Sequence, residues 1–366
     1  MKKIICGVLA AGMIFSAASA FAENMTVEQA VDYALENSYE FAKKDAEIRA
    51  SRYTAYDASS AAKSLKKNPF LEVNSFDTYL VLQGYYSDSA KLAVTVAERG
   101  EEDLALTVAN SVKNDFYTYL NSLRSEELAK ENLSIAEENL EAAKVRQKSG
   151  TLSDLDFKSF ELGLSAARAA LGDAERTRKY NLEKLKATIN YKGETELVPV
   201  GEFVYKPTEP VAYEKALELL KKSNTYLNLA DSLALSEKRW YWAYRHYNAN
   251  TNAYKVEKAN FDKAKAEYEM NIKNLDLNIL NMYNTLLGLK EQAEYLTEQT
   301  EYLKNTADAA YIRYEMGLVS AGDYRKIRQE YFSTQNELNK LELTYLVTNM
   351  SYELLFNNTM EDGTDE

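Results

Sequence analysis

The stretch RYEMGLVSAGDY, residues 313–324, recurs upstream as RQKSGTLSDLDF, residues 146–157, at a fixed offset of 167. The offset superimposes four pairs: Arg146 on Arg313, Gly150 on Gly317, Ser153 on Ser320, and Asp156 on Asp323. In both copies the glycine suits the left-handed position that ends a helix, and the serine suits the N-cap of the next helix. The carboxylate three residues later favours the positive end of that helix. The pattern predicts two helical hairpins with equivalent turns.

Apolar residues approach the second turn in steps that alternate between four and three. They are Leu275, Ile279, Met282, Leu286, Leu289, Ala293, Leu296, Thr300, Leu303, Ala307, Ala310 and Tyr314. After Gly317 the same spacing resumes at Tyr324 and continues to Leu355. A heptad seam of this kind indicates antiparallel coiled-coil helices with a left-handed supercoil. Such seams need partner helices, from within the chain and from other copies.

A longer duplication surrounds the turns. The segment 26–38, TVEQAVDYALENS, resembles 211–224, VAYEKALELLKKSN, at an offset of 186, so the first half holds 19 extra residues near 68–88. Each half is predicted to run helix, connector, very long helix, glycine turn, long helix. The predicted organisation is as follows: 1–22 signal peptide, 23–190 first repeat, 191–210 linker, 211–357 second repeat, and 358–366 disordered acidic tail. The predicted fold class is all-α dominated.

One segment alternates like a strand. Residues 76–86 are long enough to cross a membrane as a strand, and 69–74 would be a short partner, which together give a possible β-hairpin within 68–88. The matching part of the second half, RWYWAYRHY at 239–247, predicts a helix followed by a polar break. Trp240, Tyr244 and Tyr247 fall on one face of that helix. They would either mark a membrane interface or pack the end of a helical bundle.

The chain opens with Lys2 and Lys3, an apolar run and AFA ending at Ala22, which predicts a cleaved signal peptide and export. Cys6, the sole cysteine, would leave with it. Removing the two lysines leaves 42 basic and 56 acidic residues, a charge of −14, which excludes nucleic acid as a partner. His246 is the only histidine, so no metal site is expected. Asp154 and Asp156 fit helix capping better than catalysis, and no catalytic residue or cofactor is expected.

Two helix–connector–helix–turn–helix repeats behind a signal peptide resemble the outer-membrane efflux protein family, which includes TolC. The resemblance covers nearly the whole predicted mature chain and implies a homotrimer whose long helices form an α-barrel duct across the periplasm. It implies that the duct belongs to a tripartite efflux or type I secretion system, with strands from the connectors entering the outer membrane. The glycine turns would dock a periplasmic adaptor (membrane fusion) protein, which links the duct to an inner-membrane pump.

The resemblance also assigns residues. The adaptor-docking turns would comprise Arg146, Gly150, Leu152, Ser153, Arg313, Gly317, Val319 and Ser320. The aperture or gate would comprise Asp156, Tyr314 and Asp323. The membrane-proximal set would comprise Phe76, Tyr79, Val81, Tyr85, Trp240 and Trp242. Two further gate positions of the family are here Val319 and Lys326, so the gating chemistry is only half preserved.

The strand content of the connectors departs from the family. At most a short β-hairpin stands where the family has its barrel strands, so the sequence predicts a much reduced β-barrel region. An alternative function therefore stays open: a non-conducting envelope scaffold or spacer built on the same helices. Two long alternating segments in each half would have favoured the duct.

Overall fold

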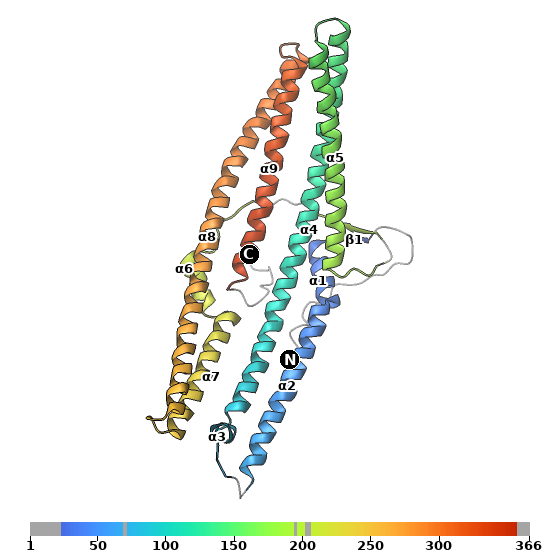
Figure 1. The fold of residues 1–366 in the computed structure, drawn as a ribbon. Helices are drawn as coiled ribbons and strands as arrows, with labels where there is room; N and C mark the ends of the chain where they lie inside the picture. Colours follow the sequence, from blue (N-terminus) through green and yellow to red (C-terminus); the bar gives the residue numbers. More distant parts are fainter. Residues whose placement is uncertain (1–22, 69–71, 194–195, 202–205, 357–366) are drawn as a thin grey trace, which may run out of the picture.

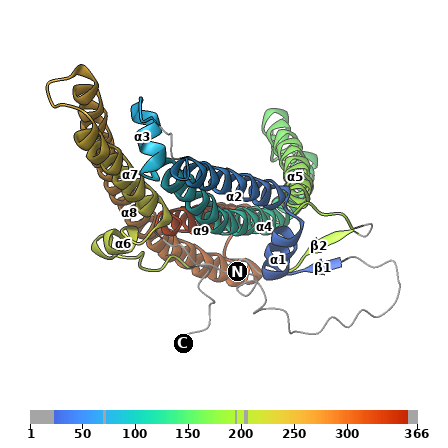
Figure 2. The same ribbon diagram turned by 90° about the horizontal axis from the view of Figure 1, so that it is seen from below.

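The computed structural model describes residues 23–68, 72–193, 196–201 and 206–356. The predicted signal peptide and acidic tail lie outside the described residues. The described chain forms an elongated bundle of long, nearly parallel hairpins (Figure 1). Seen along the hairpins, α7 and α8 lie at one side and α5 at the other, with α4 and α9 between them (Figure 2). No helix of this described part is long and apolar enough to span a membrane.

The four long helices confirm the predicted duplication. Helix α4 spans Tyr85–Lys148 and α8 spans Asn252–Glu315, with 64 residues each. Each is about 95 Å long at 1.5 Å per residue. Helix α5 spans Asp154–Thr188 and α9 spans Ala321–Glu353. Adding 167 to the bounds of α4 gives those of α8, and adding 167 to the start of α5 gives that of α9. The internal repeat therefore reproduces these three helix boundaries to the residue.

The shorter helices that open each repeat are broken at a serine. Helices α1, Val27–Asn37, and α2, Tyr39–Lys66, meet at Ser38. Helices α6, Tyr213–Leu220, and α7, Asn224–His246, are separated by a short turn that ends at Ser223. Each serine side chain accepts a backbone N–H of the following helix. A capped start favours a new helix over continuation of the previous one.

The predicted strand at 76–86 is wrong, because these residues form one short helix, a turn and the start of another helix. Helix α3 spans Phe76–Leu82, and α4 begins at Tyr85 after Gly84 takes a left-handed φ of 77°. The Ser75 side chain caps α3 by accepting the Thr78 N–H at 3.1 Å. Phe76 and Leu80, one turn apart, are both buried. Alternation of apolar residues in so short a segment fits either structure, and burial of one helical face decided it. Of the predicted partner strand 69–74, residues 69–71 lie outside the described part, and 72–74 have no regular structure.

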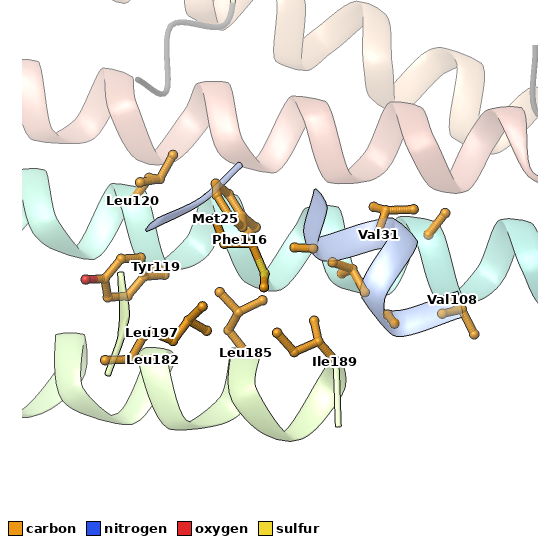
Figure 3. Packing of buried hydrophobic residues seen from close by; sticks show 14 residues of the cluster. Met25, Val31, Val108, Phe116, Tyr119, Leu120, Leu182, Leu185, Ile189 and Leu197 are labelled. Atoms are coloured by element: carbon orange, nitrogen blue, oxygen red, sulfur yellow. The ribbon is translucent and has the colours of Figure 1, made fainter. Parts of the chain in front are cut away.

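A two-stranded parallel ladder joins the start of the described chain to the linker. Strand β1, Glu23–Met25, pairs with β2, Leu197–Pro199. Met25 and Leu197 are buried in a cluster that also contains residues of α1, α4 and α5, including Phe116 and Leu185 (Figure 3). No sequence pattern indicates this ladder, since three-residue strands are too short to show a periodicity.

The heptad seam of the second repeat is a buried core. Ile279, Leu286, Ala293, Leu303 and Ala307 are all buried in α8. A second cluster joins α6, α8 and α9. Its members are Ala216, Leu220, Ile279, Leu286, Tyr345, Tyr352 and Phe356. The predicted coiled-coil packing is therefore confirmed within the chain.

Candidate functional site

The two glycine turns lie at the same end of the molecule, where α4 meets α5 and α8 meets α9 (Figure 1). Both glycines are left-handed, with φ of 73° at Gly150 and 72° at Gly317. In each turn the N–H after the glycine donates to an arginine carbonyl, at 2.9 Å to Arg146 and 2.8 Å to Arg313. The glycine N–H makes the inner bond of a Schellman motif. The carbonyl of the arginine thus closes the turn, which the backbone of any residue could do. The side chains of both arginines are exposed and are free to make other contacts.

The serines and aspartates of the turns form matching caps. The N–H groups of Asp156 and Asp323 donate to the side-chain oxygens of Ser153 and Ser320, both at 3.1 Å. The serine hydroxyls donate in return to the aspartate carboxylates at 2.7 and 2.6 Å. Each carboxylate predicted to line an aperture is thus held within its own turn. Within one chain, these two carboxylates serve separate turns.

The tips expose apolar side chains beside charged ones. Leu155 at the start of α5 is 82% exposed, and Leu318 after Gly317 is 73% exposed. Leu152 and Val319 are half-buried. We define the tip surface as Arg146, Gly150, Leu152, Ser153, Leu155, Arg313, Gly317, Leu318, Val319 and Ser320. Exposed leucines next to arginines offer apolar contact together with hydrogen-bond donors.

Tyr314 distinguishes the second tip from the first. Its ring stacks on Tyr324 at 5.6 Å between centroids, with an interplanar angle of 9°. Tyr311 contacts the same ring at 5.6 Å. In the first tip the position equivalent to Tyr314 is Gln147, whose amide donates to Asp154 at 2.9 Å. The two tips share a backbone but differ in the contact that joins their helices.

An arginine that the sequence did not single out connects the hairpins below the tips. Arg325 of α9 donates to the Asn139 side chain of α4 at 2.5 Å and lies 3.6 Å from a Glu138 carboxylate oxygen. Its side chain is only 11% exposed. One arginine in a charged helix carries no sequence signal, so only the structure shows this link.

The predicted membrane-proximal residues gather at the opposite end. Phe76, Leu80 and Ala243 are buried there. The aromatic residues that pack around them are Tyr79, Tyr85, Tyr86, Trp240, Trp242 and Tyr247. His246 stacks on Tyr79 at 4.8 Å between ring centroids. Val81 is half-buried on α3. The packing interpretation of the aromatic connector is therefore confirmed for these rings, while Tyr244 lies on the surface.

Trp240 and Tyr247, predicted to share a helical face, contact different helices. Trp240 packs on Tyr254 of α8 at 4.9 Å, and Tyr247 packs on Phe76 of α3 at 5.0 Å. Tyr247 follows the last residue of α7, so its side chain no longer has to point along the same helical face as that of Trp240.

Arg239 connects four helices beneath these rings. Its guanidinium forms two hydrogen bonds to the Glu257 carboxylate, both 2.8 Å long. It also lies over the rings of Phe76 and Tyr85, at 5.4 and 5.7 Å from their centroids. The hydrogen bonds to Glu257 raise the pKa of Arg239 further above its usual range. The arginine therefore stays charged and holds α3, α4, α7 and α8 together.

No group of three metal-binding side chains occurs among the described residues. Tyr311 and Tyr324 border a groove between α8 and α9, which is lined also by Lys304, Arg328 and Phe332.

Residues 246–352 match the sequence profile of the outer membrane efflux protein family. The fold of the whole chain is similar to that of CusC, studied for the conformational changes that accompany folding and transmembrane channel formation. That match has a TM-score of 0.71 at 12% identity and covers 94% of this chain and 95% of that one. A search of curated protein sequences gave no match.

Two outer membrane channels have the same fold. Campylobacter jejuni CmeC aligns with a TM-score of 0.66 at 14% identity, over 93% of this chain and 87% of that one. The open state of Neisseria gonorrhoeae MtrE aligns with 0.68 at 15% identity, over 93% and 91%. These matches confirm the resemblance to the TolC-like fold.

Proposed function

Because the chain has the TolC-like fold and its second repeat matches the profile of the outer membrane efflux proteins, we propose that it is the exit-duct component of a tripartite efflux or type I secretion system. In this role it acts by passage and not by catalysis. It is exported to the cell outer membrane and periplasm, assembles as a homotrimer and docks a periplasmic adaptor protein. The adaptor connects it to an inner-membrane pump.

The observation that carries this proposal is the pair of matched tips. The same backbone turn is built twice, at the same end of two hairpins whose first helices are equally long. Helix capping accounts for the glycines and serines, but not for the recurrence of exposed Arg146 and Arg313 at equivalent positions. Each tip also exposes a leucine, Leu155 in the first and Leu318 in the second, although at positions that are not equivalent. Two similar surfaces, each with an arginine at the same position and one exposed leucine, suit a partner that presents a repeated element of its own.

Exposed stripes at both edges of the helix row support assembly with other copies. On α5, Leu155 and Leu162 are exposed and seven residues apart. On α8, Tyr295 and Tyr302 are exposed with the same spacing. These two helices lie at opposite sides of the row in Figure 2. Packing α5 of one copy on α8 of the next would extend the row and close a ring.

The adaptor contact is testable by crosslinking in cells from a single introduced thiol. Leu155→Cys or Leu318→Cys would carry the crosslinker at the tip surface, and Tyr180→Cys, exposed on α5 away from the tip, is the matched control. Cys6, the one natural cysteine, lies in the predicted signal peptide. We expect the tip variants, and not the control, to capture a periplasmic adaptor. Capture of no adaptor from either tip would refute docking and favour the scaffold alternative.

A further inference from the structure

A groove lies between α8 and α9 beside a small residue of the heptad seam. The seam residue is Ala307, which is buried four residues after the larger Leu303. The groove has a volume of about 290 Å³ and is lined on α8 by residues between Lys304 and Tyr311, at the tip end of that helix (Figure 1). We call it the aromatic groove after the four rings that line it: Tyr311, Tyr324, Tyr331 and Phe332.

The four rings form two pairs. Tyr311 contacts Tyr324 at 5.6 Å between ring centroids, and Tyr331 contacts Phe332 at 5.3 Å. Tyr324 and Tyr331 are about two turns apart on α9, and Arg328 lies between them. The volume of the groove is near the lower end of the roughly 300–1,000 Å³ found for ligand pockets. The groove therefore suits a flat ligand of one or two rings.

Two cations line the groove without an ion pair. Lys304 of α8 and Arg328 of α9 pair with no carboxylate within the described part of the chain. The Arg328 guanidinium lies 5.4 Å from the centroid of the Phe332 ring, which favours this position of the cation. Among the described residues that line the groove, Asp308 alone is acidic. The lining therefore carries a positive charge in a chain whose net charge is −12.

The groove would stay accessible in the proposed ring of copies. Tyr302, on the face of α8 that would pack on α5 of the next copy, lines a different groove. Tyr302 and Tyr311 are nine residues apart, which is about two and a half helical turns, so they point to opposite sides of α8. A ligand could therefore enter the aromatic groove in a single chain and in the assembly.

We propose that the aromatic groove binds a small aromatic anion, a planar ring system that bears a carboxylate or a sulfonate. The ligand ring packs on the aromatic side chains, and its anionic group accepts hydrogen bonds from Arg328 and Lys304. Charge complementarity selects this class, because an aromatic cation would meet two like charges. Binding requires only this chain, so failure of adaptor docking would leave it standing.

The test is isothermal titration calorimetry of the purified protein with three probes that share one ring system and differ in charge. They are 2-naphthoate, the neutral 2-naphthamide and the cationic 2-naphthylmethylammonium. We expect 2-naphthoate to bind at one site per chain, about tenfold more tightly than 2-naphthamide. The cation should bind more weakly than either, and added salt should weaken the binding of 2-naphthoate.

Charge variants locate the site. Arg328→Gln should weaken 2-naphthoate binding on the order of tenfold, because a charged hydrogen-bond donor is lost. Asp308→Asn should strengthen the same binding, because a like charge is removed. Lys340→Gln and Asp262→Asn are the matched controls, since both residues are exposed on the same two helices away from the groove. Neither control should change the affinity.

A variant that fills the groove tests the ring contacts without a change of charge. Ala307→Leu should abolish 2-naphthoate binding. Leu286 holds the same heptad position three heptads earlier and is buried, so the seam accepts a leucine there. Circular dichroism of every variant verifies that the helices remain.

Several results would overturn the proposal. They are equal affinity for 2-naphthamide, tighter binding of the cation, an equal loss in Lys340→Gln and Arg328→Gln, and full binding in Ala307→Leu. Crosslinking of an adaptor from Asp308→Cys, together with no binding of 2-naphthoate, would assign the groove to a partner protein and also overturn the proposal.

Discussion

Gly317→Ala should loosen the second tip through the backbone alone. The glycine has a φ of 72°, and a Cβ built there meets no atom within 4 Å. The substitution therefore creates no clash with neighbouring residues. Alanine in the left-handed region costs roughly 1–2 kcal/mol, because its Cβ approaches the following carbonyl oxygen. The whole of that cost falls on the turn that ends α8.

Gly288→Ala is the matched control with the opposite sign. Gly288 lies inside α8, is exposed, and also has nothing within 4 Å of a built Cβ. Its backbone is helical, so alanine should stabilise the helix by about 1 kcal/mol. The two variants make the same chemical change in the same helix. Their opposite signs would come only from backbone conformation.

The measurement is amide hydrogen exchange at the Leu318 N–H, which donates to the Arg313 carbonyl at 2.8 Å. A loss of 1–2 kcal/mol in local stability should raise its exchange rate roughly 5- to 30-fold. The global denaturation midpoint should move less, because the tip opens without the rest of the bundle. Unchanged exchange in Gly317→Ala, or equal acceleration in Gly288→Ala, would refute the assignment of this turn to the left-handed glycine.

Three further outcomes are expected. Ser320→Ala removes the acceptor of the Asp323 N–H and should cost about 1 kcal/mol, read from exchange in the first turn of α9. Hydrogen bonding from Lys130 lowers the pKa of the Glu126 carboxyl, so ionised Glu126 stabilises the fold at neutral pH, and this stabilisation is lost as pH falls through the lowered pKa. In an acid titration, the free energy of unfolding of Glu126→Gln should therefore fall less than that of the unaltered protein. Burial disfavours the charged phenolate and raises the pKa of Tyr352 to about 12, so the folded state loses stability as pH rises from the ordinary tyrosine pKa through about 12. Tyr352→Phe removes the hydrogen bond that the hydroxyl donates to the Val211 carbonyl at 2.8 Å, so the variant should be less stable at neutral pH and less sensitive to alkali.

The hairpins could be predicted because the residues that determine each turn are close together in the sequence, and the same pattern occurs twice. Gly150 and Ser153 fix one turn through contacts within a few residues, and Gly317 and Ser320 repeat it. A heptad seam likewise predicts which face of a helix is buried before the partner helix is known. Fold class, repeat offset and turn positions therefore follow from spacing alone.

The opposite end could not be predicted, because its structure depends on contacts distant in sequence. The alternation at 76–86 fits a strand until Phe76 and Leu80 are seen buried against Ala243 of α7. No sequence motif indicates that Arg239 forms a hydrogen-bonded ion pair with Glu257. The β1–β2 ladder joins residues more than a hundred positions apart. In each case tertiary packing chose between local structures of similar propensity.

Because of the duplication, the two repeats are similar at the tips and differ in their connectors at the opposite end of the molecule. Because the extra residues of the first repeat enter as the connector around α3, the two 64-residue helices keep equal lengths and their tips lie at the same end of the molecule (Figure 1). A partner at the tips therefore meets two nearly equivalent surfaces in each chain. The exceptions are the Tyr314–Tyr324 stack in one tip, the Gln147–Asp154 bond in the other, and the exposed leucines, because Leu155 corresponds to Gly322 and Leu318 to Thr151. Those contacts, and not the shared turn, are where the two tips can differ in strength.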